Sequence, residues 1–366
     1  MLQVQDGINM LTNNSTFAEL FGAKTPIFQA PMAGVATPQL AAAVSEAGAV
    51  GGLGLGSSSV EKAEKAIAET QELTSKPFNV NFFCHRPAAC LEQTRQEWIS
   101  KLSEHFRNNN AAPPTSLTEG YSPFDQDPDV LRMLLRRKPA IVSFHFGLPD
   151  QSAIDAIQSY GGKVITCVTN TAEARKSELA GVDAIVAQGV EAGGHRGNFD
   201  ASRDDEIGLH TLVQLVRKSV NIPVIAAGGI MNGSSMRAVM SLGAIGVQLG
   251  TAFILCPESS ATEVHRAKLK SHAAYQTQIV RSISGRPARG ISGIFQETIE
   301  PLDLETIPDY PVAYSAAKML NAEAKKAGNG EFSPNWAGQG APLARELTAR
   351  DMVQTLMTEF AEYEGS

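Results

Sequence analysis

The sequence predicts a (β/α)8 barrel of the TIM type with an additional, mainly helical cap region. Three observations lead to this fold class. Short segments rich in apolar residues recur eight times between residues 25 and 255. Most of them are continuously apolar rather than alternating, which is typical of parallel strands covered on both faces. Helical segments lie between these strands, and eight such alternations over about 230 residues favour a closed barrel over the alternative, a doubly wound open sheet.

The expected strands and helices follow each other in regular order. The strands are Pro26–Gln29, Ala49–Gly52, Phe78–Phe82, Ile141–Phe144, Lys163–Val168, Ala184–Ala187, Pro223–Ala226 and Gly246–Leu249. Helical patterns occur at Gln39–Ala47, Val60–Glu72, Asp150–Tyr160, Thr171–Ala180, His210–Ser219 and Ser235–Leu242. Because active sites of such barrels form at the carboxyl ends of the strands, residues at those ends are the candidates for function.

Two regions interrupt this order. Residues 84–138 are too long for a single crossover and contain a loop-like stretch, Asn108–Pro114, so we expect an inserted helix and a long loop over one face of the barrel. After the eighth strand, helical patterns occur at Glu258–Ala274, Tyr310–Lys326 and Pro342–Tyr363.

These interruptions suggest how the chain divides into domains. We expect the barrel over residues 1–255, completed by a C-terminal helix around residues 342–363. Residues 256–341 are then expected to form a helical cap on the substrate side.

Composition excludes several classes of protein. The chain has 366 residues, and 31 Lys and Arg against 38 Asp and Glu give a net charge of −7, which argues against a nucleic-acid partner. The longest uncharged stretch, Thr25–Ser45, contains three prolines and fails as a membrane helix. Met1–Leu20 shows no secretory pattern, and the four cysteines form no Cys-x-x-Cys pair. We therefore expect a cytoplasmic protein with reduced thiols, no metal site and no membrane partner.

Glycines follow the seventh and eighth expected strands. The seventh strand is followed by Gly228 and Gly229. The eighth strand ends in Gln248 and Leu249 and is followed by Gly250 and Thr251. Glycine lets backbone N–H groups approach an anion, and these two loops are the usual phosphate site of a barrel. The pair of loops therefore predicts a phosphorylated ligand, with tight turns that hold no ligand as the alternative.

Histidines also occur at strand ends. His195 lies in Gly193–Gly197, where flanking glycines let the loop approach a ligand. A near-neutral pKa suits general acid–base catalysis, although spacing alone equally allows a structural loop histidine. His145 ends the fourth strand, where a supporting role is the simpler interpretation. For Arg196 we favour a surface charge over an anion clamp.

Tyr310, Tyr314 and Lys318 are spaced four residues apart. On a continuous helix they would lie along one face. Two phenols and an ammonium could line a pocket for a small anion, and an exposed amphipathic stripe is the alternative interpretation.

Four segments together resemble the motifs of the nitronate monooxygenase family, formerly called 2-nitropropane dioxygenases. The last three of these segments are specific to its class I branch when they occur together, whereas the Gly-Gly-His core of the fourth alone also occurs in FMN-dependent enoyl-acyl-carrier-protein reductases. The resemblance covers about residues 25–340, so the ten residues before Leu11 are not part of it. The segments are Gln29–Met32, Phe78–Phe83, Ser143–Pro149 and Ala187–Gly197.

The resemblance implies an FMN-dependent barrel that oxidises alkyl nitronates, propionate 3-nitronate especially, with dioxygen to a carbonyl product and nitrite. It implies that His195 is the catalytic base and that Tyr310, Tyr314 and Lys318 lie on the substrate side, where we also expect His145. Residues expected to contact FMN are Ala30, Pro31, Met32, Asn81, Gln188, Gly193, Gly228, Gly229, Gln248, Leu249, Gly250 and Thr251. Two alternatives stay open, namely an FMN-dependent NAD(P)H reductase and a non-catalytic phosphate-binding barrel.

Overall fold

The computed structural model of the protein describes residues 15–300 and 303–362. Eight parallel strands form one sheet in the order β1-β9-β8-β6-β5-β4-β3-β2. Parallel pairing between Phe28 and Val50 joins its two ends, β1 and β2, so the sheet closes into a barrel. The predicted fold class is therefore confirmed, and the open-sheet alternative is excluded. The strands are β1 Ile27–Gln29, β2 Gly51–Gly54, β3 Phe78–Phe83, β4 Ile141–His145, β5 Lys163–Val168, β6 Ala184–Gln188, β8 Val224–Ala227 and β9 Gly246–Leu249.

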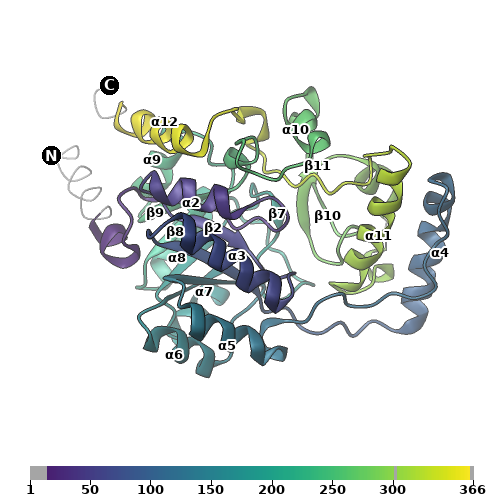
Figure 1. Cartoon of the computed structure of the whole chain (residues 1–366), viewed down its shortest axis with the longest axis horizontal. Coiled ribbons are helices and arrows are strands. Elements are labelled where there is room, and N and C mark those ends of the chain that lie inside the picture. The colour runs from purple at the N-terminus through teal and green to yellow at the C-terminus, as the bar shows by residue number, and fades with distance from the viewer. Residues whose placement is uncertain (1–14, 301–302, 363–366) are drawn as a thin grey trace.

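Helices surround the barrel and extend beyond it on one side (Figure 1). Several begin directly after a polar capping residue. Thr37 accepts a hydrogen bond from the Leu40 N–H, and Asn232 forms a capping box with Ser235, which satisfies backbone donors that a helix start leaves unpaired. The helices are α2 Pro38–Glu46, α3 Val60–Leu73, α4 Glu92–Asn108, α5 Pro128–Arg137, α6 Gln151–Ser159, α7 Thr171–Leu179, α8 Leu209–Ser219, α9 Gly233–Ser241, α10 Glu263–Leu269, α11 Val312–Lys326 and α12 Ala349–Glu362.

Apolar side chains fill the end of the barrel where the strands begin. Phe17, Phe21 and Phe28 pack edge to face, with ring centroids 4.9–5.5 Å apart. They share a buried cluster with Ile141 and Ala184, the first residues of β4 and β6. Because this end is filled, only the end where the strands finish is left for a site.

The C-terminal helix α12 packs against α9 and α2 (Figure 1). It therefore takes the position of the eighth barrel helix. The contact is close, because a Cβ on Gly233 would lie 2.2 Å from the backbone nitrogen of Phe360. The helix begins at Ala349 rather than at the predicted Pro342.

The insertion after β3 differs from the prediction, because it contains two helices rather than one. The first, α4, leaves the barrel and packs on α11. Its Trp98, Leu102 and Phe106 are buried in a second hydrophobic core that α11 shares. The second, α5, packs against α3 and α6 and is an ordinary barrel helix. Its start is marked by Asp127, which caps the helix ahead of Pro128, a signal that the loop-rich composition of the insertion obscured.

The cap contains a small sheet besides its helices. β10 Thr277–Val280 and β11 Ala288–Ile291 pair antiparallel, and β11 also pairs with β7 Gly194–His195. The predicted helix at Glu258–Ala274 is shorter, since α10 covers only Glu263–Leu269. The division into residues 1–255 and 256–341 stays a prediction, and the packing of α4 adds part of the first segment to the cap. The segment before Leu11 lies outside the described residues.

No helix within residues 15–300 and 303–362 is both long and apolar enough to cross a membrane.

Candidate active site

A cavity of about 420 Å³ lies between the carboxyl ends of the barrel strands and the cap. Every site residue predicted above lines it, although those residues come from six strands, their loops and the cap. The convergence follows from topology, since parallel strands in a barrel all end on the same rim. The lining residues predicted from the sequence are Ala30, Pro31, Met32, Asn81, His145, Gln188, Gly193, His195, Gly228, Gly229, Gln248, Leu249, Gly250, Thr251, Tyr310, Tyr314 and Lys318. Their individual roles stay predictions.

The loops after β8 and β9 form one wall of the cavity from backbone. Gly228 and Gly229 have φ values of 133° and 66°, which favour glycine. Among the described residues, the N–H groups of Gly228, Gly229 and Gly250 have no hydrogen-bond acceptor. Unpaired N–H groups next to a cavity are suited to bind an anion such as a phosphate.

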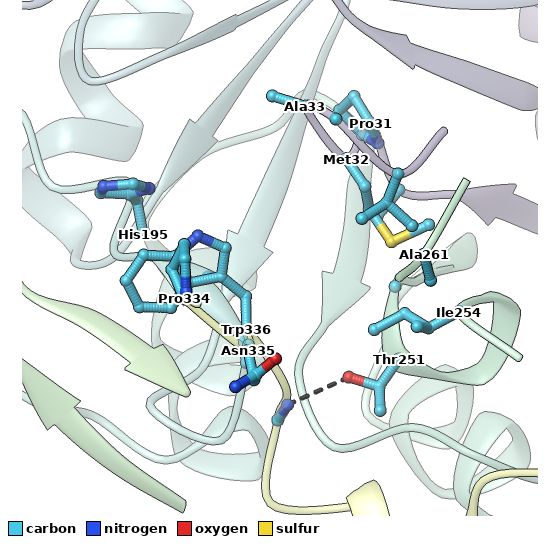
Figure 2. A pocket seen from close by; sticks show the side chains of 18 of the residues that line it. Pro31, Met32, Ala33, His195, Thr251, Ile254, Ala261, Pro334, Asn335 and Trp336 are labelled. Carbon is cyan, nitrogen blue, oxygen red and sulfur yellow. Dashed lines mark hydrogen bonds between the residues drawn. The ribbon is translucent and has the colours of Figure 1, made fainter. Parts of the chain in front are cut away.

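A third loop closes against this wall. The Gly338 N–H donates a hydrogen bond of 3.0 Å to Thr251 Oγ1, drawn as the dashed line in Figure 2. At Gly193 a Cβ would lie 2.5 Å from the Ala337 carbonyl carbon, so only glycine allows this approach. The segment around Ala337 therefore belongs to the site, although the sequence analysis did not single it out.

His195 lies beside Trp336 and across the cavity from Met32 (Figure 2). Its ring centroid is 5.3 Å from that of Trp336, 5.5 Å from Tyr310 and 5.8 Å from Tyr314. Its Nε2 is buried and has no hydrogen-bond partner among the described residues.

Burial keeps the His195 imidazole neutral. It lowers the pKa of His195 to about 3, and the nearby charges of Arg286 and Lys318 act in the same direction. A neutral imidazole with a free nitrogen can accept a proton from a bound molecule.

His145 and Gln188 hold the backbone of His195. His145 Nε2 donates to the His195 carbonyl oxygen at 3.1 Å, and Gln188 Nε2 donates to the same oxygen at 3.0 Å. Burial also lowers the pKa of His145 to about 4. Both side chains therefore fix the position of His195, which agrees with the supporting role considered for His145.

The prediction that Arg196 is a surface charge is wrong. Its side chain is fully buried, forms an ion pair of 2.8 Å with Asp204, and donates to the Gly189 carbonyl at 2.7 Å. These partners occupy the guanidinium, so Arg196 is no free anion clamp either. Instead it fixes the loop between Gln188 and His195.

Tyr310, Tyr314 and Lys318 face the cavity, but not from one continuous helix. The helix α11 begins at Val312, after Pro311, so Tyr310 lies in the preceding turn. The Lys318 Nζ lies 4.3 Å from the Tyr314 ring centroid. Lys318 has no carboxylate partner among the described residues. Burial raises the pKa of both tyrosines, so their hydroxyls stay protonated and can donate hydrogen bonds.

Tyr121 and Trp336 are aromatic residues that contact the predicted site residues but were not predicted from the sequence. Tyr121 lies in the insertion, hydrogen-bonds to the Tyr310 hydroxyl, and places its ring 5.1 Å from Lys318 Nζ. Trp336 lies in the Gly- and Pro-rich segment after α11. Nothing in the spacing of either residue marks it, because both reach the site through contacts distant in the sequence.

The charges around the cavity are all positive. Among the described residues that line it, none is Asp or Glu, and Lys318 and Lys325 are its lysines. This contrasts with the whole chain, where 38 acidic residues outnumber 31 basic ones. The cavity is therefore suited to an anion.

Known proteins resemble this chain over nearly its whole length. The family model of nitronate monooxygenase matches residues 14–359. A nitronate monooxygenase of Pseudomonas aeruginosa is 47% identical over 345 residues, which are 94% of this chain and 98% of the relative. One from Paraburkholderia phytofirmans is also 47% identical, with 96% of each chain covered.

Solved structures show the same likeness. The nitroalkane oxidase from Streptomyces ansochromogenes has a TM-score of 0.86 and 38% identity, covering 94% of this chain and 98% of its own. FabK from Thermotoga maritima has a TM-score of 0.73 and 30% identity, covering 95% of this chain and 96% of its own.

Proposed function

The chain belongs to the nitronate monooxygenase family, and on that premise we propose that it binds FMN and oxidises alkyl nitronates with dioxygen. The products are a carbonyl compound and nitrite, and propionate 3-nitronate is the substrate that we expect to fit best. Removal of a reactive nitronate by an enzyme located in the cytoplasm is a detoxifying activity.

The observation that carries the proposal is the absence of carboxylates from the described lining of the cavity. A nitronate is an anion, and its neutral parent nitroalkane is not. Lys318 has no carboxylate partner among the described residues, so a second anionic group on the substrate can pair with it. The protonated hydroxyls of Tyr310 and Tyr314 supply hydrogen bonds on the same side.

The residues of the cavity fit FMN. The free N–H groups of Gly228, Gly229 and Gly250 are donors for its phosphate, and Asn81 and Gln188 are polar groups for its ring. Asn81 Nδ2 donates to Ser143 Oγ at 2.9 Å, which fixes the orientation of the Asn81 amide. When bound, FMN supplies the electron acceptor for the oxidation.

His195 is the group that holds or moves a proton. Its free Nε2 can take the α-proton of a neutral nitroalkane, while His145 and Gln188 keep its backbone in place. With a pre-formed nitronate no proton has to leave, and His195 then only contributes to the shape and polarity of the site.

A visible spectrum of the purified protein, followed by mixing with a nitronate without oxygen, tests the proposal. We expect a yellow protein whose flavin absorbance is lost on mixing and returns with nitrite release when oxygen is admitted. A colourless protein that takes up no FMN on incubation would support the non-catalytic phosphate-binding barrel instead.

An FMN-dependent NAD(P)H reductase is the second candidate, and the likeness to FabK at 30% identity favours keeping it. Rapid oxidation of NADH or NADPH by the purified protein, without loss of flavin absorbance on mixing with a nitronate, would replace the monooxygenase proposal by this one.

A further inference from the structure

Arg286 is a buried cation behind the wall of the cavity. It is 4% exposed and precedes β11. Its guanidinium carbon lies 4.3 Å from the centroid of the Phe146 ring, and Phe146 lines the cavity. Arg286 itself does not, so a single aromatic ring separates its charge from any bound molecule.

The Arg286 charge has no close counter-ion. No carboxylate of the described residues lies within ion-pair distance of it. Glu173 and Asp200 are the carboxylates that act on it from farther away. Glu173 accepts hydrogen bonds from the Thr169 and Phe199 N–H groups at 2.7 and 2.8 Å, and Asp200 is exposed to solvent, which screens it.

The hydrogen bonds of Arg286 leave part of its capacity unused. Nη2 donates to the Asn198 carbonyl oxygen, but Nε has no partner among the described residues. Burial of a cation without full pairing is costly, and it lowers the pKa of Arg286 to about 10. Such a charge is stabilised by an anion that binds where little water screens it.

The Phe146 ring contacts both Arg286 and the aromatic residues in the middle of the site. Its ring centroid lies 5.7 Å from that of His195 and 5.1 Å from that of Tyr310. Its φ of 72° is uncommon for a bulky residue, so the surrounding structure holds the ring where it is. An anion next to His195 is therefore close to Arg286, with no water layer needed between the ring and the guanidinium.

We propose that Arg286 is a positioning residue that selects the anionic form of the substrate. Its charge stabilises a nitronate bound beside His195 and leaves a neutral nitroalkane unaffected. The choice of nitronate as the anion rests on the proposed function, whereas the selection of an anion rests on Arg286 alone.

Two substitutions separate the charge of Arg286 from its hydrogen bonds. Arg286→Gln keeps N–H donors for Asn198 and removes the charge, and Arg286→Lys keeps the charge. The matched control is Arg289→Lys, because Arg289 is also buried, lies in β11 and donates to the Val190 carbonyl at 2.9 Å. Neither arginine lines the cavity, but of the two only Arg286 stacks, among the described residues, on a ring that does. For each variant, kcat/KM is measured with ethyl nitronate and with nitroethane.

We expect Arg286→Gln to lower kcat/KM for ethyl nitronate about tenfold relative to nitroethane. Arg286→Lys should keep this ratio within about threefold of the wild type, as should Arg289→Lys. Equal losses on both substrates with Arg286→Gln, or a tenfold change of the ratio with either lysine variant, would overturn the proposal. If Arg286→Gln does not fold, Arg286→Met, which also removes the charge, takes its place, and an unchanged ratio in that variant overturns the proposal.

Calorimetric binding of ethyl nitronate to the protein with its flavin already reduced, without oxygen, distinguishes this proposal from the proposed function, because a reduced flavin cannot oxidise the ligand during the titration. Binding that weakens about tenfold in Arg286→Gln supports the role of Arg286 even if the protein never oxidises the ligand. Unchanged binding in that variant contradicts it, whatever the turnover.

Discussion

The barrel side and the cap side of the cavity are built from different materials. On the barrel side, Gly228, Gly229 and Gly250 contribute mainly backbone N–H groups. On the cap side, Tyr314, Lys318 and Trp336 contribute side chains. The backbone N–H groups on the barrel side are accessible because glycine has no Cβ. The cap side instead acts through the side chains themselves. Retention of a cofactor and choice of a substrate should therefore respond to different mutations.

The largest expected effect is at His195, which joins the two sides. His195→Asn should lower activity on neutral nitroalkanes by about 10² to 10⁴, the usual contribution of a general base. Activity on pre-formed nitronates should fall less, and FMN should remain bound. Steady-state rates with both forms of one nitroalkane measure this, and equal losses would leave His195 with a positioning role only.

A change on the cap side should affect the choice of substrate and not the retention of FMN. Lys318→Met keeps the length of the side chain and removes its charge. It should raise the KM for propionate 3-nitronate by about 10- to 150-fold, the range of a charge-assisted hydrogen bond. The KM for nitronates with uncharged tails should stay nearly the same. If both values move together, the carboxylate is recognised elsewhere, and the exposed Lys325 is the next residue to test.

A change on the barrel side should affect the retention of FMN and not the choice of substrate. At Gly250 a Cβ would lie 3.5 Å from the Ala30 Cβ and 3.8 Å from the Met32 Sδ, which are ordinary contacts. Gly250→Ala is thus the matched control, and the larger side chain of Gly250→Leu should weaken FMN binding about tenfold or more. The flavin absorbance per protein measures this. Full occupancy in the leucine variant would show that the phosphate lies elsewhere.

The smallest expected effect is that of pH on the wild type. Because burial lowers the pKa of His195 to about 3, the base form persists well below neutral pH. Between pH 7 and 5, kcat/KM for a neutral nitroalkane should change less than about threefold, whereas a base with the ordinary pKa of about 6.5 would lose about 25-fold. A decline of about 25-fold would indicate that His195 is solvated in the free enzyme.

The barrel strands were predictable because burial on both faces makes a parallel strand continuously apolar. The ends of those strands then identified the barrel side of the site and His195. The second helix of the insertion was missed because its loop-rich surroundings concealed the cap formed by Asp127. The small sheet of the cap was missed because β7 has two residues, too few for any periodicity.

Side-chain environments were harder to predict. Arg196 was expected on the surface, since glycines flank it and its partner Asp204 lies eight residues away in an irregular loop. Tyr121 reaches the site through contacts with Tyr310 and Lys318, and Arg286 through its contact with Phe146. Such long-range contacts leave no pattern in a single sequence.

The pairing of β7 with β11 has a consequence for how ligands enter and leave. His195 and Ala288 are opposite each other in this ladder, and the Arg196 N–H donates to the Pro287 carbonyl at 2.8 Å. The strand that carries the imidazole is thus a member of the cap's own sheet, so the cap cannot swing away without breaking backbone hydrogen bonds. We therefore expect ligands to enter and leave without a hinge motion of the whole cap, at rates set by diffusion and charge.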